Sequence, residues 1–393
     1  MIPERLEGAE WLGRPDVQAI FGALEGAAGR TRAVGGIVRD SLIGRVRDKT
    51  DIDMATELLP VAVMQKARAA GIAAYPTGID HGTVTLRLGE TSVEVTTLRR
   101  DVTTDGRHAE VAFGTDWVED AQRRDFTLNA LYCCADGRLF DPLGGVGDLI
   151  NGRVRFIGDA GQRIAEDGLR VYRFFRFSAS HGGQHFDPDG LAACRDAVGR
   201  LGHLSRERVG SEMLRMLALP KVARTLGAMA AIGLLERPET ILRPLQLYED
   251  LGGHDAAARL ALLAPEGLEA LQAEWRLAND MAGRAARIGG AATLLIEGKP
   301  NWAAYKYGEE AVEGLAVAAA RADWPRDLLA ETARDLGRLP VAPLPVSGKD
   351  LVARGMRPGP ELGAILQELE KQWVESGFTL DPESLLGAVQ ALD

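Results

Sequence analysis

The chain of 393 residues has few of the side chains that most often build metal and redox centres. Its three cysteines, Cys133, Cys134 and Cys194, are odd in number and lack the Cys-x-x-Cys spacing of zinc and redox sites. With only six histidines, the dyad His254-Asp255 has too few partner ligands for a metal-dependent phosphohydrolase. We therefore expect buried thiols in a reducing cytoplasm, without a zinc or redox site.

The chain also lacks long apolar runs and an excess of positive charge. No apolar run is long enough to span a bilayer, and residues 1–10 are polar and acidic, without the apolar region of a signal peptide. A net charge of −10 argues against broad, nonspecific binding to nucleic acid. The clustered arginines of residues 159–220 still permit local contact with RNA. At this length we expect two or three domains, each with its own core.

The most informative stretch is residues 33–56, which read as strand, glycine pair, helix, basic linker and second strand. Gly35 and Gly36 precede the helix, where glycines let the backbone approach a ligand and a helix N-terminus favours phosphate. Side chains alternate along a strand, so Asp51 and Asp53 share one face of the second strand. Two adjacent carboxylates repel each other unless a cation such as Mg²⁺ neutralises them. Together the two sites indicate chemistry on a metal-bound nucleoside triphosphate.

In order and spacing this stretch resembles motif A of the class II tRNA nucleotidyltransferases (CCA-adding enzymes) and bacterial poly(A) polymerases, in the polymerase-β-like nucleotidyltransferase superfamily. The resemblance implies an α+β fold, in which a nucleotidyltransferase head with a small mixed sheet precedes an all-helical neck, body and tail. It implies three domains: residues 1–150 form the head, 151–220 a helical neck with a template for the nucleotide base, and 221–393 a helical body and tail that bind tRNA.

A second informative pair is Arg124-Asp125, just before an apolar stretch that reads as a strand. The carboxylate can accept from a ribose hydroxyl while the guanidinium meets phosphate or sugar oxygens, although a simple ion pair is the structural alternative. The pair closely resembles motif B, which implies binding of the nucleotide's ribose. We include Arg39 and Asn129, from the same two stretches, among the candidate nucleotide-binding residues.

The third informative stretch, residues 166–177, reads as one helix on which Asp167 and Arg170 are neighbours. A local salt bridge is the simpler interpretation. However, cytosine and adenine both present an amine donor beside a ring-nitrogen acceptor, which a carboxylate and a guanidinium match; uracil and guanine present the opposite polarity. The pair would then admit CTP and ATP and reject UTP and GTP, and it resembles the template motif D. Arg173 and Arg176 continue the ridge and suit triphosphate or base contacts.

Three other segments match the family in its own order. Residues 140–149 resemble motif C, to which we give no catalytic role. Residues 204–217 resemble motif E and predict a neck helix that begins with a capping Ser205. Residues 345–375 resemble the family's tail, for which the resemblance implies RNA contact.

Residues 99–119 have no apolar period and are rich in charge, glycine and threonine. This composition predicts a mobile surface loop in which nothing can bury. The resemblance implies that it assists the switch from adding C to adding A. Just before it, Glu94 lies on a predicted strand; it is a candidate third metal partner, although an outward-facing side chain is favoured.

The implied reaction is nucleotidyl transfer, in which the 3′-hydroxyl of tRNA attacks the α-phosphate of CTP or ATP and pyrophosphate leaves. Asp51 and Asp53 would hold two Mg²⁺ ions. The expected partners are the tRNA 3′ end, CTP and ATP, with no membrane and no inferred protein partner. A poly(A) polymerase and an enzyme adding only CC or only A stay open as alternatives. A non-enzymatic RNA-binding protein is a different class, against which the intact Asp51, Asp53 and Arg170 argue.

Overall fold

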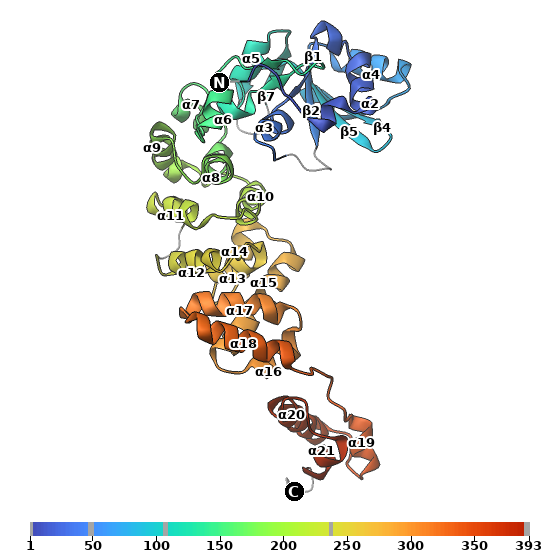
Figure 1. Cartoon of the computed structure of the whole chain (residues 1–393), viewed down its shortest axis with the longest axis vertical. Helices are drawn as coiled ribbons and strands as arrows, with labels where there is room; N and C mark the ends of the chain where they lie inside the picture. Colours follow the sequence, from blue (N-terminus) through green and yellow to red (C-terminus); the bar gives the residue numbers. More distant parts are fainter. Residues whose placement is uncertain (1–2, 46–50, 105–108, 236–238, 389–393) are drawn as a thin grey trace. The chain divides into compact units, whose positions relative to one another are not determined.

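The computed structural model describes most of the chain, namely residues 3–45, 51–104, 109–235 and 239–388. The chain divides into two compact units: Met1–Leu204 with Ile232–Leu234, and Ser205–Ala231 with Leu235–Asp393. All strands of the described residues lie in the first unit, and the second is built from helices (Figure 1). This arrangement confirms the predicted α+β fold with a small mixed sheet followed by helices.

The first unit is organised on a seven-stranded mixed sheet with the order β3-β4-β5-β2-β1-β8-β9. Its strands are β1 Thr31–Val34, β2 Ile52–Thr56, β3 Ala73–Gly78, β4 Thr83–Leu88, β5 Thr91–Thr97, β8 Tyr132–Cys133 and β9 Leu139–Phe140. The neighbours β2 and β5 are parallel, and the other neighbouring pairs are antiparallel. Along β2, buried Ile52 and Met54 alternate with exposed Asp53, as a strand with one polar face requires. The predicted second strand is therefore confirmed, with Asp51 just before its first residue.

The first unit also contains α-helices and short 3-10 helices. They are α1 Glu10–Gly13, α2 Pro15–Ala23, η1 Gly26–Ala28, α3 Gly36–Leu42, α4 Pro60–Ala69, η2 Ile79–His81, α5 Trp117–Gln122, η3 Thr127–Asn129, α6 Gly145–Ile150, α7 Ala160–Glu166, α8 Leu169–His181, α9 Pro188–Ala197 and η4 Val198–Arg200. The turn from β1 into α3 passes through Gly35, whose φ of 71° lies in the left-handed region that favours glycine. The predicted strand, glycine turn and helix thus form as expected.

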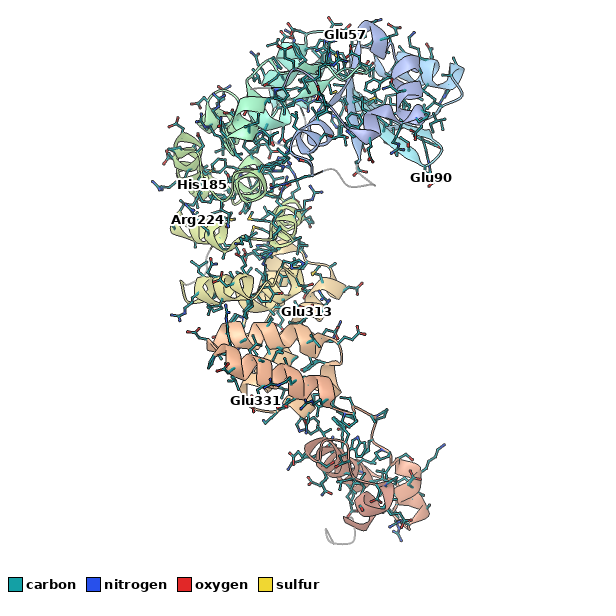
Figure 2. All side chains as sticks on the ribbon, viewed as in Figure 1. Glu57, Glu90, His185, Arg224, Glu313 and Glu331 are labelled. Atoms are coloured by element: carbon teal, nitrogen blue, oxygen red, sulfur yellow. The ribbon has the colours of Figure 1, made fainter. Side chains whose placement is uncertain are left out.

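Residues 99–119 differ from the expected loop. Strands β6 Arg99–Thr104 and β7 Ala109–Phe113 pair in an antiparallel hairpin, and residues 105–108 lie outside the described residues. The expectation that nothing here can bury is wrong, because Trp117 packs into a core with Ala130 and Tyr132. Its indole Nε1 donates to Glu57 Oε1 at 2.9 Å, and Glu57 is labelled in Figure 2. Backbone pairing builds the hairpin, so no apolar period was needed to form it.

The second unit is a succession of helices, and an extended stretch connects α18 to α19 (Figure 1). The helices are α10 Arg206–Leu217, α11 Ala223–Ala231, α12 Glu239–Asp250, α13 Ala256–Leu263, α14 Glu269–Trp275, α15 Asn279–Ile296, α16 Pro300–Tyr307, α17 Glu310–Ala322, α18 Arg326–Arg338, α19 Gly348–Ala353, α20 Pro360–Glu375 and α21 Pro382–Ala388. The predicted cap of α10 is confirmed, since the Ser205 hydroxyl accepts from the Arg208 amide at 3.4 Å. Among the described residues, every helix is too short or too polar to cross a membrane.

Candidate active site

A cavity of about 430 Å³ opens in the first unit beside the start of α3. This volume lies within the range of roughly 300–1,000 Å³ of small-molecule sites. The cavity is lined by Gly35, Gly36, Arg39, Asp53, Arg124, Asp125, Asn129, Asp167, Arg170, Arg173 and Phe177. The structure thus brings together residues from β2, α3, α8 and the turn before β8. Of the candidate residues named from the sequence, Asp51, Glu94 and Arg176 are not among the lining residues.

One edge of the cavity carries an excess of negative charge. Asp53 on β2 stands beside Glu94 on the parallel neighbour β5. Although the carboxylate reaches solvent, the surrounding protein and the charges of Glu94 and Asp51 raise the pKa of Asp53 to about 6, against an opposing effect of Arg124. Glu94 is exposed, as favoured from the sequence, but its charge still acts on Asp53.

The donor set at this edge fits a hard divalent cation. The repulsion from Glu94 and Asp51 is only partly offset by Arg124, because the pKa of Asp53 stays raised. No three acidic, histidine or cysteine side chains of the described part of the chain converge into a metal site. Magnesium commonly binds through one or two carboxylates together with substrate phosphates. The residues present therefore fit Mg²⁺ held by two carboxylates and completed by a bound triphosphate.

The other walls carry four arginines, and each guanidinium has a carboxylate partner. The ion pairs are Arg39 Nε–Asp40 Oδ1 at 2.7 Å, Arg124 Nη2–Asp120 Oδ2 at 3.1 Å, Arg170 Nη1–Glu166 Oε2 at 2.6 Å and Arg173 Nη2–Asp125 Oδ2 at 2.6 Å. Each of these side chains is less than a third exposed, so the pairs are screened less than surface pairs. The cavity therefore presents guanidinium groups that are already oriented before a ligand binds.

The simple ion pair between Arg124 and Asp125 is absent, because each residue binds a different partner. Asp125 accepts from Arg173 Nε at 2.7 Å, from the Phe126 amide at 2.8 Å and from Asn129 Nδ2 at 2.9 Å. Burial alone would raise the pKa of the Asp125 carboxyl, but Arg173 and these hydrogen bonds hold it below its usual value. Asp125 is therefore an ionised acceptor at the cavity wall, as ribose binding requires.

Asn129 connects two of these groups. Its Nδ2 donates to Asp125, and its Oδ1 accepts from Arg39 Nη1 at 2.6 Å. The apolar stretch around it was expected to be a strand. It instead forms the short 3-10 turn η3 before β8, which turns Asn129 towards the cavity.

The expected continuous helix over residues 166–177 is wrong. Helix α7 ends at Glu166 and α8 begins at Leu169, with Asp167 in an extended conformation between them (φ −149°). Asp167 Oδ1 accepts from the Leu169 amide at 3.1 Å, so it caps α8 from outside the helix. Asp167 and Arg170 nevertheless both line the cavity. Asp167 and Arg170 are neighbours because both lie at the start of α8. The sequence did not reveal this start, because its helical period continues across the break between α7 and α8.

Arg176 lies outside the cavity lining, with its guanidinium 4.3 Å from the ring centre of Phe177. Phe177 does line the cavity and was missed from the sequence. Its ring also lies 5.1 Å from the guanidinium of Arg39 and 5.3 Å from that of Arg173. The signal was present in the spacing, because residue 177 follows Arg173 by one helical turn.

The motif C segment supports the turn that carries Asn129. Asp141 accepts from the amides of Gly145 and Val146 at 2.8 and 2.9 Å, which fixes the start of α6. Gly145 packs so tightly on the Thr127 carbonyl that an added Cβ would overlap it. None of these residues lines the cavity, so the segment acts through packing.

Comparison with family models defines the class of the first unit. Residues 31–155 match the Poly A polymerase head domain, and residues 183–241 match a model described as the probable RNA and SrmB-binding site of polymerase A. The cavity residues from Gly35 to Asn129 lie within the head match, and the four on the α8 side, Asp167, Arg170, Arg173 and Phe177, follow it. The protein is therefore a nucleotidyltransferase with a poly(A) polymerase type of head.

Whole-chain relatives narrow the class to one family. The mitochondrial CCA tRNA nucleotidyltransferase 1 of Mus musculus is 32% identical over 91% of this chain and 86% of its own length, and the CCA-adding enzyme of Levilactobacillus brevis is 31% identical over 99% and 98%. The chain belongs to the CCA-adding enzyme family, which confirms the resemblance seen in the motifs.

Solved structures agree with this assignment. The Bacillus stearothermophilus CCA-adding enzyme in complex with CTP superimposes with a TM-score of 0.78 at 29% identity, covering 96% of this chain and 98% of that one. The Thermotoga maritima CCA-adding enzyme complexed with tRNA shares the fold, with a TM-score of 0.70 at 17% identity over 98% of both chains.

Proposed function

We propose that this protein adds CMP and AMP, from CTP and ATP, to the 3′ end of tRNA without a nucleic-acid template. The observation that carries the proposal is a single cavity in which an acidic edge at Asp53 faces four anchored arginines. A metal-bound nucleoside triphosphate has the matching charges: a cation to meet the carboxylates and phosphates to meet the guanidinium groups. The relatives, named as CCA-adding enzymes and CCA tRNA nucleotidyltransferases, support this reaction.

In this proposal the chain's residues orient a triphosphate whose α-phosphate is attacked by the terminal 3′-hydroxyl of tRNA. The P–O bond to pyrophosphate breaks as the new phosphodiester forms. Mg²⁺ held by Asp51 and Asp53 would supply Lewis-acid stabilisation to the attacking and leaving oxygens. Arg39, Arg124 and Arg173 would neutralise the phosphates, with their orientation already fixed by Asp40, Asp120 and Asp125.

Recognition of the sugar and the base falls to two acceptors. Asp125, with Asn129 fixed beside it, would accept from a ribose hydroxyl. Asp167 would accept from the exocyclic amine of cytosine or adenine, while Arg170 donates to the adjacent ring nitrogen. Glu166 holds Arg170 through a 2.6 Å contact, which fixes the direction in which the guanidinium donates. UTP and GTP would place a carbonyl against the Asp167 carboxylate and be rejected.

The remaining regions are assigned more broadly. We propose residues 1–150 as the catalytic head, 151–220 as the neck with the base template and 221–393 as the tRNA-binding body and tail. The match of residues 183–241 to an RNA-binding model supports RNA contact at the neck and the start of the body. The three cysteines are free thiols, which fits a reducing compartment, and we propose the cytoplasm.

The test is incubation of purified protein with tRNA lacking its 3′ end, Mg²⁺ and each nucleoside triphosphate singly and in pairs, followed by sequencing of the product ends. The proposal predicts ends completed as CCA when both CTP and ATP are present. Ends that stop at CC would instead show a CC-adding enzyme, a single added A would show an A-adding enzyme, and a long A tract would show a poly(A) polymerase. A poly(A) polymerase is the second candidate, because the head match extends to that class.

A further inference from the structure

We infer that Asp120 and Tyr132 are positioning residues for Arg124, holding its guanidinium with one nitrogen towards the cavity and the whole group away from Asp53. The inference rests on the proposed nucleotide site and adds to it two residues that do not line the cavity. Both are buried: the Asp120 side chain is 1% exposed, and Tyr132 is fully enclosed. Neither therefore contacts substrate, and any effect on nucleotide binding must pass through Arg124.

The hydrogen bonds leave one donor group of Arg124 unused. Arg124 Nη2 donates to Asp120 Oδ2 at 3.1 Å, while Nε donates to the Tyr132 hydroxyl at 3.2 Å and to Asp120 Oδ2 at 3.3 Å. The third nitrogen, Nη1, takes part in no hydrogen bond among the described residues. It points towards Gly35, where a Cβ would lie 3.9 Å from it. Because Gly35 lines the cavity before α3, Nη1 is the donor available to a bound phosphate or sugar oxygen.

The protonation states fix the direction of these bonds. Burial raises the pKa of the Tyr132 hydroxyl, so this group stays protonated and has one hydrogen to donate. It donates that hydrogen to Asp120 Oδ2 at 2.8 Å and accepts from Arg124 Nε. Burial would raise the pKa of Asp120, but Arg124, Arg123 and Tyr132 together lower it, so the carboxylate is ionised. Asp120, Tyr132 and Arg124 thus form a closed triangle with a single arrangement of hydrogens.

Asp53 competes with Asp120 for the guanidinium of Arg124, which explains why Arg124 has to be held in place. Arg124 and Asp53 line the same cavity, so their opposite charges attract each other across it. Without Asp120 the guanidinium would be drawn towards the acidic edge, where it would occupy carboxylate oxygens that are proposed to hold the metal. Arg123 contacts the other oxygen of Asp120, Oδ1, at 2.8 Å from its Nε, so Arg124 and Arg123 do not compete for the same acceptor atom.

The test is equilibrium binding of CTP with Mg²⁺, measured without tRNA, for wild type, Tyr132→Phe and Asp120→Asn. Tyr132→Phe keeps the ring and removes two hydrogen bonds of the triangle, so CTP affinity should fall by about three- to tenfold. Asp120→Asn should lower it further. The matched control is Tyr248→Phe in the helical unit, a buried tyrosine whose hydroxyl accepts from the Asp255 amide at 3.3 Å. It should lose comparable thermal stability while binding CTP as the wild type does.

A double-mutant cycle separates positioning from a general loss of structure. In an Arg124→Gln background, Tyr132→Phe should change CTP affinity by less than about 1.5-fold, because the group that it positions is gone. An equal loss of affinity in both backgrounds, or a Tyr132→Phe protein that binds CTP as tightly as Tyr248→Phe, would overturn the inference. A wild type that neither binds CTP nor extends tRNA would instead overturn the proposed function on which the inference rests.

Discussion

Two buried arginine–carboxylate pairs, one in each unit, illustrate when such a pair is structural and when it serves a site. In the helical unit, Arg259 pairs with Glu249 at 3.1 Å, and both side chains are at most 1% exposed. Arg259 also donates to the carbonyls of Leu217, Leu219 and Pro220, so its two terminal nitrogens are both used within the protein. In the head, Arg124 pairs with an equally buried Asp120 but keeps Nη1 directed at a cavity.

The difference extends to the charge state that each environment favours. Burial dominates at Arg259 and lowers its pKa despite Glu249. At Arg124, burial also acts to lower the pKa, but Tyr132 and Asp120 outweigh it, and the pKa is raised. The comparison teaches that burial of an ion pair is no sign of function by itself. A donor left over after all internal partners are counted, and aimed at a cavity, is the informative feature.

The largest effect on activity is expected from a substitution at Asp53, in the acidic edge of the cavity. Asp53→Ala should abolish nucleotidyl transfer, by at least about 10²–10³-fold, because metal-bound stabilisation of the transition state is lost. Binding of tRNA, measured by filter retention, should survive. Wild-type turnover of the variant with Mg²⁺ would show that the metal assignment is wrong.

The next largest effect is expected from a variant that removes the structural ion pair between Arg259 and Glu249. Arg259→Met leaves Glu249 buried without its cation, and hydrogen bonds from the amides of Val222 and Ala223, at 2.6 and 3.0 Å, then remain to it among the described residues. We expect the helical unit to lose about 3–5 kcal/mol of unfolding free energy in urea. CTP affinity of the folded fraction should stay unchanged, in contrast to Asp120→Asn. A selective loss of CTP binding in Arg259→Met would remove the distinction between the two pairs.

A smaller effect concerns specificity rather than rate. Asp167→Ala and Arg170→Ala each remove a charge-assisted hydrogen bond to the correct base, at a cost of about 1.5–3 kcal/mol, together with the penalty against UTP and GTP. Single-turnover incorporation should show discrimination falling more than activity, with measurable UMP addition. If both variants keep the wild-type preference for CTP over UTP, the template assignment fails and specificity resides elsewhere on α8.

The smallest effect is pH-dependent and concerns the Arg39–Asp40 pair. Burial acts to raise the pKa of Asp40, but hydrogen bonds from His181 and Arg39 outweigh it and lower the pKa to about 2. A depressed pKa contributes stability above the unfolded value of 3.8, and this contribution is lost as pH falls towards 2. Asp40→Asn should therefore be about 1–2 kcal/mol less stable at pH 7, with the difference shrinking below pH 4. Urea unfolding at several pH values checks this, and a constant difference would contradict it.

Much of the site could be predicted from the sequence because its signals are local. The position of Asp53 between two apolar residues predicts a strand with one polar face, and the glycines before α3 predict a turn into a helix. Each prediction needs only a few adjacent residues. The partners of the arginines are not local. Asp125 binds Arg173, 48 residues away, while its neighbour Arg124 turns back to Asp120, so the ion pair between adjacent residues, left open from the sequence, does not form. These choices depend on side-chain rotamers and tertiary packing, which no pattern of residue types contains.

The prediction of secondary structure failed where the structure depends on interactions that produce no periodic pattern of apolar residues. The break at Asp167 falls inside a continuous apolar period, so the sequence predicts one helix through it. The β6–β7 hairpin is held by backbone hydrogen bonds, which most side chains permit, and buried Trp117 opens the helix α5 that follows it. Strand β2 and helix α10, whose buried apolar side chains repeat at a regular spacing, were therefore predicted correctly, whereas the hairpin and the break at Asp167 were not.

The tight packing of Gly145 on the Thr127 carbonyl has a consequence for selection experiments. In a library of random variants selected for transfer activity, position 145 should accept almost no replacement, because even a methyl group displaces the turn that holds Asn129. Its tolerance profile would then be as narrow as that of Asp53, although the residue contacts no substrate. Retention of glycine at position 145 under such selection would reflect the lack of space for a side chain. Comparing glycine, alanine and serine at this position would distinguish that steric requirement from a role in the reaction.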